Sequence, residues 1–143
     1  MSDSPVFVDT NVLVYLRDSR DPERQRKAAE WLGHLWESRL GRLSVQVLHE
    51  YYVTVTSKLD PGLPTEEARE DILALGAWSP LPLTPELAEK AWDAQDRWGF
   101  SFWDSLIVAS AQAQRCGTLL TEDLSHDQDL DGLRVVSPFV ETP

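Results

Sequence analysis

Four acidic residues stand at positions from which the folded chain could gather them into a site for one or two metal ions. They are Asp9, Glu50, Asp104 and Asp123. Several carboxylates in one place repel each other, and their pKa values rise unless a divalent cation neutralises them. No histidine or cysteine is placed among the four, and an oxygen-only set suits Mg²⁺ or Mn²⁺ rather than Zn²⁺. The chemistry this predicts is metal-ion catalysis, in which the ion polarises a substrate oxygen and lowers the pKa of a bound water.

Each acid also has an ordinary explanation when it is taken alone. Asp9 could cap the following helix, and Asp104 could complete a capping box with Ser101. Glu50 could be a surface charge, and Asp123 could be a turn former. The flanking sequence favours a site, because Asp9 follows three consecutive apolar residues and Asp104 shares a helix face with apolar residues three, four and seven positions later.

The elements that would position these acids alternate between short apolar segments and helical patterns. Strands are expected near residues 5–8, 42–45, 81–83, 118–121 and 133–136, and helices over 12–17, 22–40, 48–59, 65–75, 85–98 and 101–116. With no hairpin turn recognised, the connections should be crossovers. The expected fold is α/β, a three-layer sandwich with a parallel four- to five-stranded sheet flanked by helices.

Sites in such open sheets form outside the carboxyl ends of the strands. Asp9 directly follows the first expected strand, and Asp123 comes just after the fourth. Glu50 lies within the first two turns of the helix after the second strand, and Asp104 within the first turn of the helix before the fourth. We therefore expect Asp9 and Asp123 to emerge at the same edge of the sheet, whereas Glu50 and Asp104 depend on helices for their placement.

Composition limits the class of protein. The 143 residues suit a single domain spanning 1–143, and 42% hydrophobic with 26% charged residues is ordinary for a soluble protein. No apolar stretch suits a membrane span and no signal peptide is recognised, so a cytoplasmic protein is expected.

The net charge of −11 argues against a polyanionic partner at long range. In the segment 17–42, called the basic segment below, basic residues outnumber acids. Its basic residues are Arg17, Arg20, Arg24, Arg26, Lys27, Arg39 and Arg42. This segment is either a local surface for nucleic acid or a solvated helix face with mixed ion pairs. Both interpretations stay open from the sequence.

Several short motifs resemble a known family. Val8-Asp9-Thr10-Asn11-Val12-Leu13, the isolated Glu50, Phe102-Trp103-Asp104-Ser105-Leu106-Ile107 and Leu120-Thr121-Glu122-Asp123 resemble, in this order, the signature of PIN-domain ribonucleases. The resemblance looks closest to VapC toxins of bacterial toxin–antitoxin pairs. It includes Val136-Ser137-Pro138-Phe139, which is similar to the Asn-Pro-Phe ending of one branch with Ser137 in place of asparagine.

The resemblance implies a Mg²⁺- or Mn²⁺-dependent endoribonuclease that acts as a toxin. Asp9 and Asp104 would bind the metal directly, Asp123 would complete the cluster directly or through water, and Glu50 would orient or deprotonate the attacking water. Supporting groups would be Asn11 and Thr121. The implied partners are an RNA substrate, a VapB-like antitoxin and a second copy of the chain in a homodimer.

Two other functions compete with this interpretation. A catalytically silent PIN-like binding module would have lost at least one acid, whereas all four are present. Another Mg²⁺-dependent phosphohydrolase with an aspartyl nucleophile would want a second aspartate two residues after the first, where Asn11 stands.

Two further features bear on the structure. Residues 127–132 resemble the start of a calcium loop, but Pro138 occupies the position of its last acidic ligand. Trp31, Trp36 and Trp92 are expected to pack in the core. For Trp103, beside Asp104, the sequence leaves open whether it packs or stacks on a base.

Overall fold

The computed structural model describes residues 4–143. Its elements, in chain order, are β1 Val6–Val8, α1 Thr10–Arg17, α2 Pro22–Ser38, β2 Gly41–Arg42, α3 Val45–Val53, the π-helical turn η1 Thr54–Lys58, α4 Thr65–Leu75, the 3-10 turn η2 Gly76–Trp78, α5 Pro85–Trp98, α6 Phe102–Ala113, β3 Thr118–Leu120, β4 Asp129–Leu130 and β5 Leu133–Val136.

The strands form one sheet in the order β2-β1-β3-β5-β4. The first three pairings are parallel, with Val8 of β1 opposite Leu120 of β3 and Leu120 opposite Val136 of β5. This register brings the carboxyl ends of β1 and β3 level with each other. Asp9 and Thr121, which follow these two strands, therefore lie side by side, and the Thr121 hydroxyl donates a hydrogen bond to the Asp9 carboxylate.

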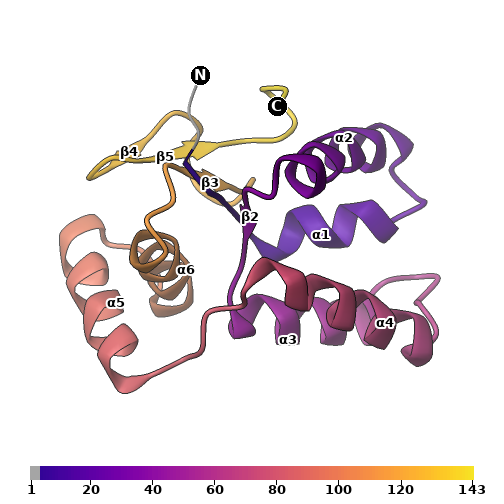
Figure 1. Ribbon diagram of the computed structural model, residues 1–143, viewed down its shortest axis with the longest axis horizontal. Coiled ribbons are helices and arrows are strands. Elements are labelled where there is room, and N and C mark those ends of the chain that lie inside the picture. Colours follow the sequence, from indigo (N-terminus) through magenta and orange to yellow (C-terminus); the bar gives the residue numbers. More distant parts are fainter. Residues whose placement is uncertain (1–3) are drawn as a thin grey trace.

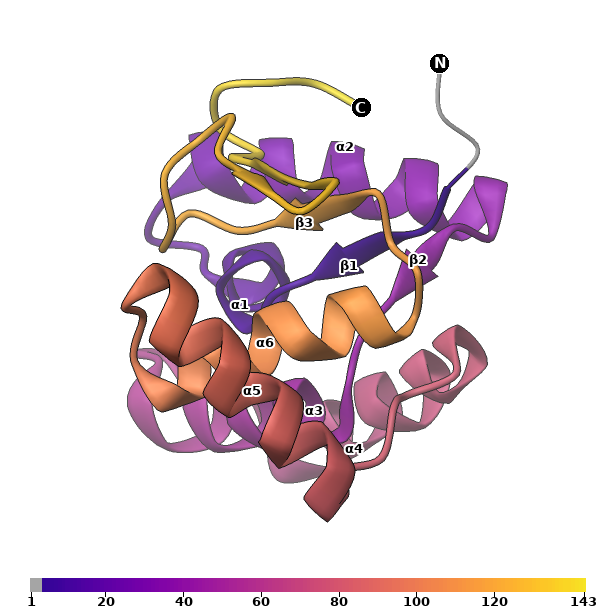
Figure 2. The ribbon, with the colours of Figure 1, turned by 90° about the vertical axis from the view of Figure 1, so that its left-hand side faces the viewer.

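The strands are covered by helices on two sides, which confirms the expected α/β sandwich. Figure 1 shows α5 and α6 on one side of the strands, α1 and α2 on the other, and α3 and α4 below them. After the quarter turn of Figure 2, α6 and α2 still lie on opposite sides of β1 and β3. Phe7, Val8, Leu119 and Leu120 are fully buried between these layers.

The helix starts follow the expected capping chemistry. Asp21 and Thr84 accept hydrogen bonds from the backbone N–H of the third helical residue, and a proline follows each of them. Ser101 caps α6 in the same way. The predicted helix over 48–59 begins earlier, at Val45, and continues through η1 to Lys58.

Two expectations about the sheet are wrong. The segment 81–83 forms no strand, only an isolated bridge between Leu81 and Ser44, because Pro80 before it and Pro82 within it have no backbone N–H to donate to a ladder. The sheet is also not wholly parallel, since β4 pairs antiparallel with β5.

The β4–β5 hairpin turns at Asp131 and Gly132. Both residues have positive φ, 56° and 94°, which is the backbone that a two-residue hairpin turn requires. Asp-Gly between apolar residues is a strong hairpin signal. The sequence prediction missed this hairpin because Asp131 and Gly132 also fit the calcium-loop pattern of residues 127–132.

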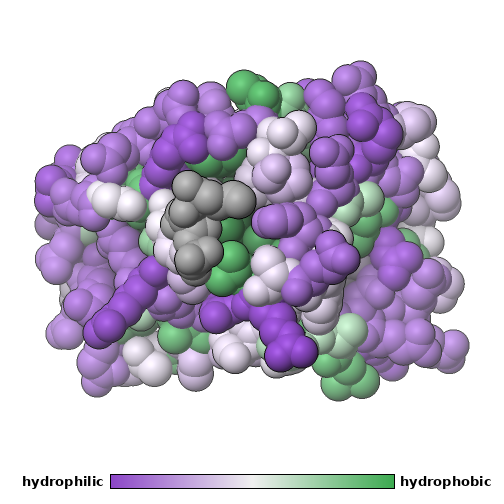
Figure 3. All heavy atoms as spheres, turned by 45° about the horizontal axis from the view of Figure 1, so that its top comes forward, coloured by the Kyte–Doolittle hydropathy of each residue, from purple (hydrophilic) through white to green (hydrophobic). Residues whose placement is uncertain are grey.

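The outer surface is mostly polar. In the view of Figure 3, hydrophilic residues cover most of the face and hydrophobic ones appear in small areas between them. Trp31 is buried as expected, but Trp36 and Trp92 are 43% and 52% exposed, which corrects their placement in the core. Within residues 4–143, no helix combines the length and apolar character needed to span a membrane.

Candidate functional site

A cleft of about 680 Å³ opens at the carboxyl edge of β1 and β3. All four predicted acids line it: Asp9, Glu50, Asp104 and Asp123. They arrive from four different parts of the chain, the end of β1, α3, the first turn of α6 and the loop after β3. The tertiary structure thus brings together residues that the sequence separates by up to 114 positions.

Asp9 is the buried member of the group, with 6% of its surface exposed. Its Oδ1 accepts a hydrogen bond from the Thr10 N–H at 2.7 Å, and its Oδ2 accepts one from the Thr121 hydroxyl at 2.9 Å. Burial raises the pKa of Asp9 to about 7, and the nearby charges of Asp123 and Glu50 act in the same direction. Within the described chain no arginine, lysine or histidine pairs with this carboxylate.

Thr121 is the centre of a hydrogen-bond network that ties two of the acids together. Its hydroxyl donates to Asp9 and accepts from the Asn11 side chain at 3.2 Å and from the Asp123 N–H at 3.1 Å. Asn11 also donates to the Asp123 carboxylate at 3.0 Å. Asn11 and Thr121, predicted as supporting groups, therefore orient acids on β1 and on the loop after β3.

Glu50 of α3 lines the cleft and is exposed. Its Oε1 accepts from the Thr10 hydroxyl at 2.8 Å and its Oε2 from the Gln46 side chain at 3.4 Å. Two uncharged donors, a hydroxyl and an amide, therefore orient the Glu50 carboxylate. Thr10 belongs to the first turn of α1, so the same turn contacts both Asp9 and Glu50.

Asp104 is half-buried in the first turn of α6. The Asp104 N–H donates to the Ser101 hydroxyl at 3.1 Å, which is the cap that the sequence predicted as an ordinary explanation. The cap does not exclude a role in the site, because the Asp104 carboxylate also lines the cleft. Burial raises the pKa of Asp104, and Asp123 raises it further.

The donor set fits a hard divalent cation. The four acids offer only oxygen ligands, Asp9 is buried without a protein cation, and the Asn11 Oδ1 atom is buried with no hydrogen-bond partner. A cation in this cleft would neutralise the charge of the acids.

The carboxylate oxygens of the four acids in the cleft lie farther apart than the ligand atoms of a site in which three protein atoms bind the same ion. Within residues 4–143, the group that has three ligand atoms within 4.8 Å of one another is His126, Asp127 and Glu141. That group already holds a cation, because the Arg134 guanidinium donates to both Asp127 and Glu141. The wider spacing at the cleft suits Mg²⁺, which keeps several of its waters and uses few protein carboxylates.

Sequence reasoning missed two residues of the site, Thr10 and Gln46. Gln46 is buried and donates to Glu50, four residues later on the same helix, and to the backbone oxygen of Trp103 at 3.5 Å. The i,i+4 spacing from Glu50 was a signal that could have identified it. Thr10 carried no signal besides its place next to Asp9.

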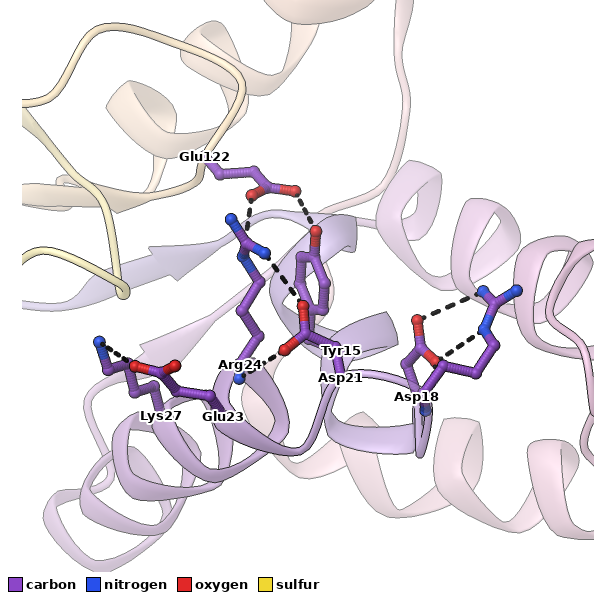
Figure 4. Close-up of polar contacts among 8 residues, drawn as sticks. Tyr15, Asp18, Asp21, Glu23, Arg24, Lys27 and Glu122 are labelled. Atoms are coloured by element: carbon purple, nitrogen blue, oxygen red, sulfur yellow. Dashed lines mark hydrogen bonds and ion pairs between the residues drawn. The ribbon is translucent and has the colours of Figure 1, made fainter.

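A second set of polar contacts holds the loop between Thr121 and Asp123 in place through Glu122. Glu122 accepts from the Tyr15 hydroxyl at 2.8 Å and lies 4.0 Å from the Arg24 guanidinium (Figure 4). Burial and Glu122 raise the pKa of Tyr15 to about 12. Arg24 also lies over the ring of Phe139, 5.2 Å from its centroid. The C-terminal segment therefore contacts the groups that hold this loop.

Much of the basic segment 17–42 is engaged in ion pairs. Arg17 binds Asp71 through two nitrogens, at 3.0 Å and 2.6 Å. Arg24 pairs with Asp21, and Lys27 with Glu23 (Figure 4). Arg20 lines the cleft and pairs with Asp18. This pattern favours the solvated helix face over a free basic surface.

Comparison with known families decides the class of protein. The family model of the PIN domain matches residues 6–128. The chain belongs to the PIN domain family. No curated protein matches the sequence significantly.

Solved structures with the same fold include toxins of toxin–antitoxin pairs. A toxin–antitoxin complex from Klebsiella pneumoniae is 21% identical, with a TM-score of 0.65, over 94% of this chain and 98% of that chain. VapC20 of Mycobacterium tuberculosis, described as a sarcin-ricin loop cleaving toxin, is 21% identical with a TM-score of 0.55, over 80% and 86%. VapBC2 of Rickettsia felis, bound to a promoter DNA fragment, is 16% identical with a TM-score of 0.59, over 92% and 97%.

The burial of Asp9 predicts a pH dependence of stability in the metal-free PIN domain. Its pKa is raised from an ordinary 3.8 to about 7, so the folded state holds the proton more tightly than the unfolded chain. This contribution stabilises the fold below about pH 4 and is lost as the pH rises toward 7. Asp9→Asn should remove that loss, so the variant gains up to about 4 kcal/mol over wild type between pH 4 and pH 7.

Urea unfolding in EDTA across this pH range measures the difference. Asp93→Asn, an exposed change on α5, is the control and should follow wild type. A constant difference between wild type and Asp9→Asn at every pH would contradict the prediction.

Proposed function

We propose that this PIN domain is a divalent-metal-dependent endoribonuclease that hydrolyses RNA phosphodiester bonds. The observation that carries the proposal is the cleft in which a buried, unpaired Asp9 carboxylate meets Glu50, Asp104 and Asp123. Membership of the PIN domain family supports it. A catalytically silent module would not need to keep a buried carboxylate that costs stability in the absence of a cation.

Asp9 and Asp104 would hold a Mg²⁺ or Mn²⁺ ion, and Asp123 would complete its surroundings directly or through water. When bound, such an ion polarises the phosphodiester and offsets the charge that develops on it. Glu50 would accept the proton of the attacking water, because its carboxylate faces the cleft and is oriented by Thr10 and Gln46.

Thr121 and Asn11 would act through the acids. Thr121 holds the Asp9 carboxylate in place, and Asn11 holds Asp123. An aspartyl-phosphate mechanism has no support here, since the Asn11 amide donates to Thr121 and Asp123.

We also propose that the enzyme is the toxin of a type II toxin–antitoxin pair. The solved structures with this fold include a toxin–antitoxin complex and VapBC2, and they cover nearly the whole chain. The expected partners are a VapB-like antitoxin and a second copy of the chain, acting in the cytoplasm where RNA is available. A short reading frame for a small DNA-binding protein next to this one would support the pair.

Removing single acids should abolish hydrolysis while the fold stays intact. Glu50→Gln is expected to lower the cleavage rate at least about 100-fold, which is the usual contribution of a general base. Asp9→Asn and Asp104→Asn should lower it at least as much, because each removes a ligand of the ion that polarises the phosphodiester. A fluorescently labelled random-sequence RNA with Mg²⁺ or Mn²⁺ reports cleavage. Asp93→Asn should cleave like wild type, since its side chain lies outside the cleft lining.

Full activity in any of the three acid variants would contradict the assigned roles. Folded wild type that binds metal but cleaves no RNA would favour the silent module. Hydrolysis of a small phosphomonoester without RNA cleavage would favour another phosphohydrolase.

Metal binding should raise the melting temperature, because the ion binds the folded acids and hardly binds the unfolded chain. At roughly ten times Kd, Mg²⁺ or Mn²⁺ should raise it by about 3–6 °C. Asp9→Asn should lose most of this shift. Asp127→Asn, which changes the separate group beside Arg134, should keep it; loss of the shift in Asp127→Asn alone would place the metal there instead.

Lys58 is expected to contact the RNA backbone. It lines the cleft, is exposed, and makes no ion pair with any residue in the described part of the chain. Lys58→Ala should weaken RNA binding and reduce the log–log salt slope by roughly 0.7, the effect of one phosphate contact on a single strand. Fluorescence anisotropy in EDTA at several salt concentrations measures the slope.

Lys90→Ala is the control, because Lys90 is also exposed but lies on α5 outside the cleft. Arg17→Ala should destabilise the fold through loss of the Asp71 contact and leave the slope unchanged. A slope equal to wild type in Lys58→Ala would show that RNA is held elsewhere.

A further inference from the structure

Trp103 is an exposed tryptophan at the edge of the acidic cleft. It is 58% exposed, directly precedes Asp104 in the first turn of α6, and lines the cleft with the acids. A single exposed tryptophan is not unusual on a protein surface, but an indole that lines a cleft offers a flat face on which a base can stack. The sequence left the role of this residue open.

The other exposed tryptophans differ from Trp103 in their surroundings. Trp36 packs against Trp78 with ring centroids 5.0 Å apart, and Trp92 is 52% exposed on α5. Neither lines the cleft. Trp103 is therefore the tryptophan that faces the proposed reaction site, and Trp92 offers a matched comparison of similar exposure.

The backbone and ring of Trp103 are held in place. Its ring makes a T-shaped contact with Phe102, with centroids 5.2 Å apart and planes at 72°. Its backbone oxygen accepts from Gln46, which also donates to Glu50. The Ser101 cap fixes the turn that carries it. A ring presented from a fixed helix start loses little entropy when a planar ligand stacks on it.

The charge of the cleft favours a ligand contact that does not depend on charge. The four acids and the net charge of −11 repel phosphates, and Lys58 is the one cleft lysine without an ion pair among residues 4–143. Stacking of a base on an aromatic ring is insensitive to base identity and needs no cation. An indole beside Asp104 supplies affinity that electrostatics in this cleft cannot supply.

We propose that Trp103 forms a nucleobase subsite, on which an unpaired base of single-stranded RNA stacks while an adjacent phosphate lies at the acids. The subsite rests on the proposed ribonuclease function. It selects unpaired nucleotides over base-paired ones, because a base within a duplex is already stacked on its neighbours and its face is not available. It selects weakly among the bases, since each base has a π face.

The test compares binding of two oligomers with the same phosphates, a single-stranded RNA and its abasic counterpart. Anisotropy is measured with Mg²⁺ and with every protein, wild type at Trp103 included, carrying Glu50→Gln, so that a cation can neutralise the acids while cleavage is slow. Trp103→Ala should bind the RNA about 5- to 150-fold more weakly than wild type, the range measured for loss of one base–aromatic stack. It should bind the abasic oligomer like wild type, and its salt slope should not change. Trp103→Phe should lose less.

Trp92→Ala is the control and should match wild type on both oligomers. Retention of the Mg²⁺-induced rise in melting temperature by Trp103→Ala shows that the neighbouring Asp104 is undisturbed. The subsite is contradicted if Trp103→Ala binds RNA within twofold of wild type, if it weakens both oligomers equally, or if Trp92→Ala loses as much.

The two proposals fail differently. Wild type that cleaves RNA, with Trp103→Ala binding and cleaving equally well, contradicts the subsite and leaves the ribonuclease intact. Wild type that neither binds nor cleaves RNA contradicts both. Wild type that binds RNA through Trp103 but never cleaves it, with any metal, contradicts the ribonuclease and supports the subsite in a silent binding module.

Discussion

A buried carboxylate without a protein cation is the constraint on which the rest of this site depends. Asp9 leaves the carboxyl end of β1 between β3 and α1, and only hydrogen bonds from Thr10 and Thr121 offset its burial. In the absence of metal its pKa rises to about 7, which means that the folded protein resists its ionisation. A bound divalent cation would reverse that resistance, so the same residue links stability and metal binding.

The groups around this carboxylate are ordered by neutral donors rather than by arginines or lysines. Thr121 and Asn11 orient Asp9 and Asp123, while Thr10 and Gln46 orient Glu50. Neutral donors hold the acids in place and leave their negative charge uncompensated. This arrangement suits a site that must attract a cation, whereas a salt bridge at the same place would compete with it.

An acidic protein that binds RNA needs local contacts to overcome long-range repulsion. The structure uses most of its basic segment internally, since Arg17, Arg24 and Lys27 pair with neighbouring acids. At the cleft, Lys58 and the Trp103 ring remain available, and under the proposed function a metal ion would join them. Under the proposed function, affinity arises from neutralisation at the acids and from stacking, and therefore depends less on salt than in a basic RNA-binding protein.

The sequence alone predicted the layered fold and singled out four acids that the structure places in one cleft, because strand-then-helix patterning and the rule that sites follow strand ends are local signals. It did not predict the antiparallel strand β4, because the Asp131-Gly132 turn also fits the pattern of a calcium loop. It also predicted a strand at 81–83 that the structure does not have. Only the tertiary structure decided that Gln46 of α3 reaches the Trp103 backbone on α6, that Trp103 lines the cleft, and that Arg17 of α1 pairs with Asp71 of α4. These contacts join residues from different helices, and how helices pack against each other is not written in the period of any one of them.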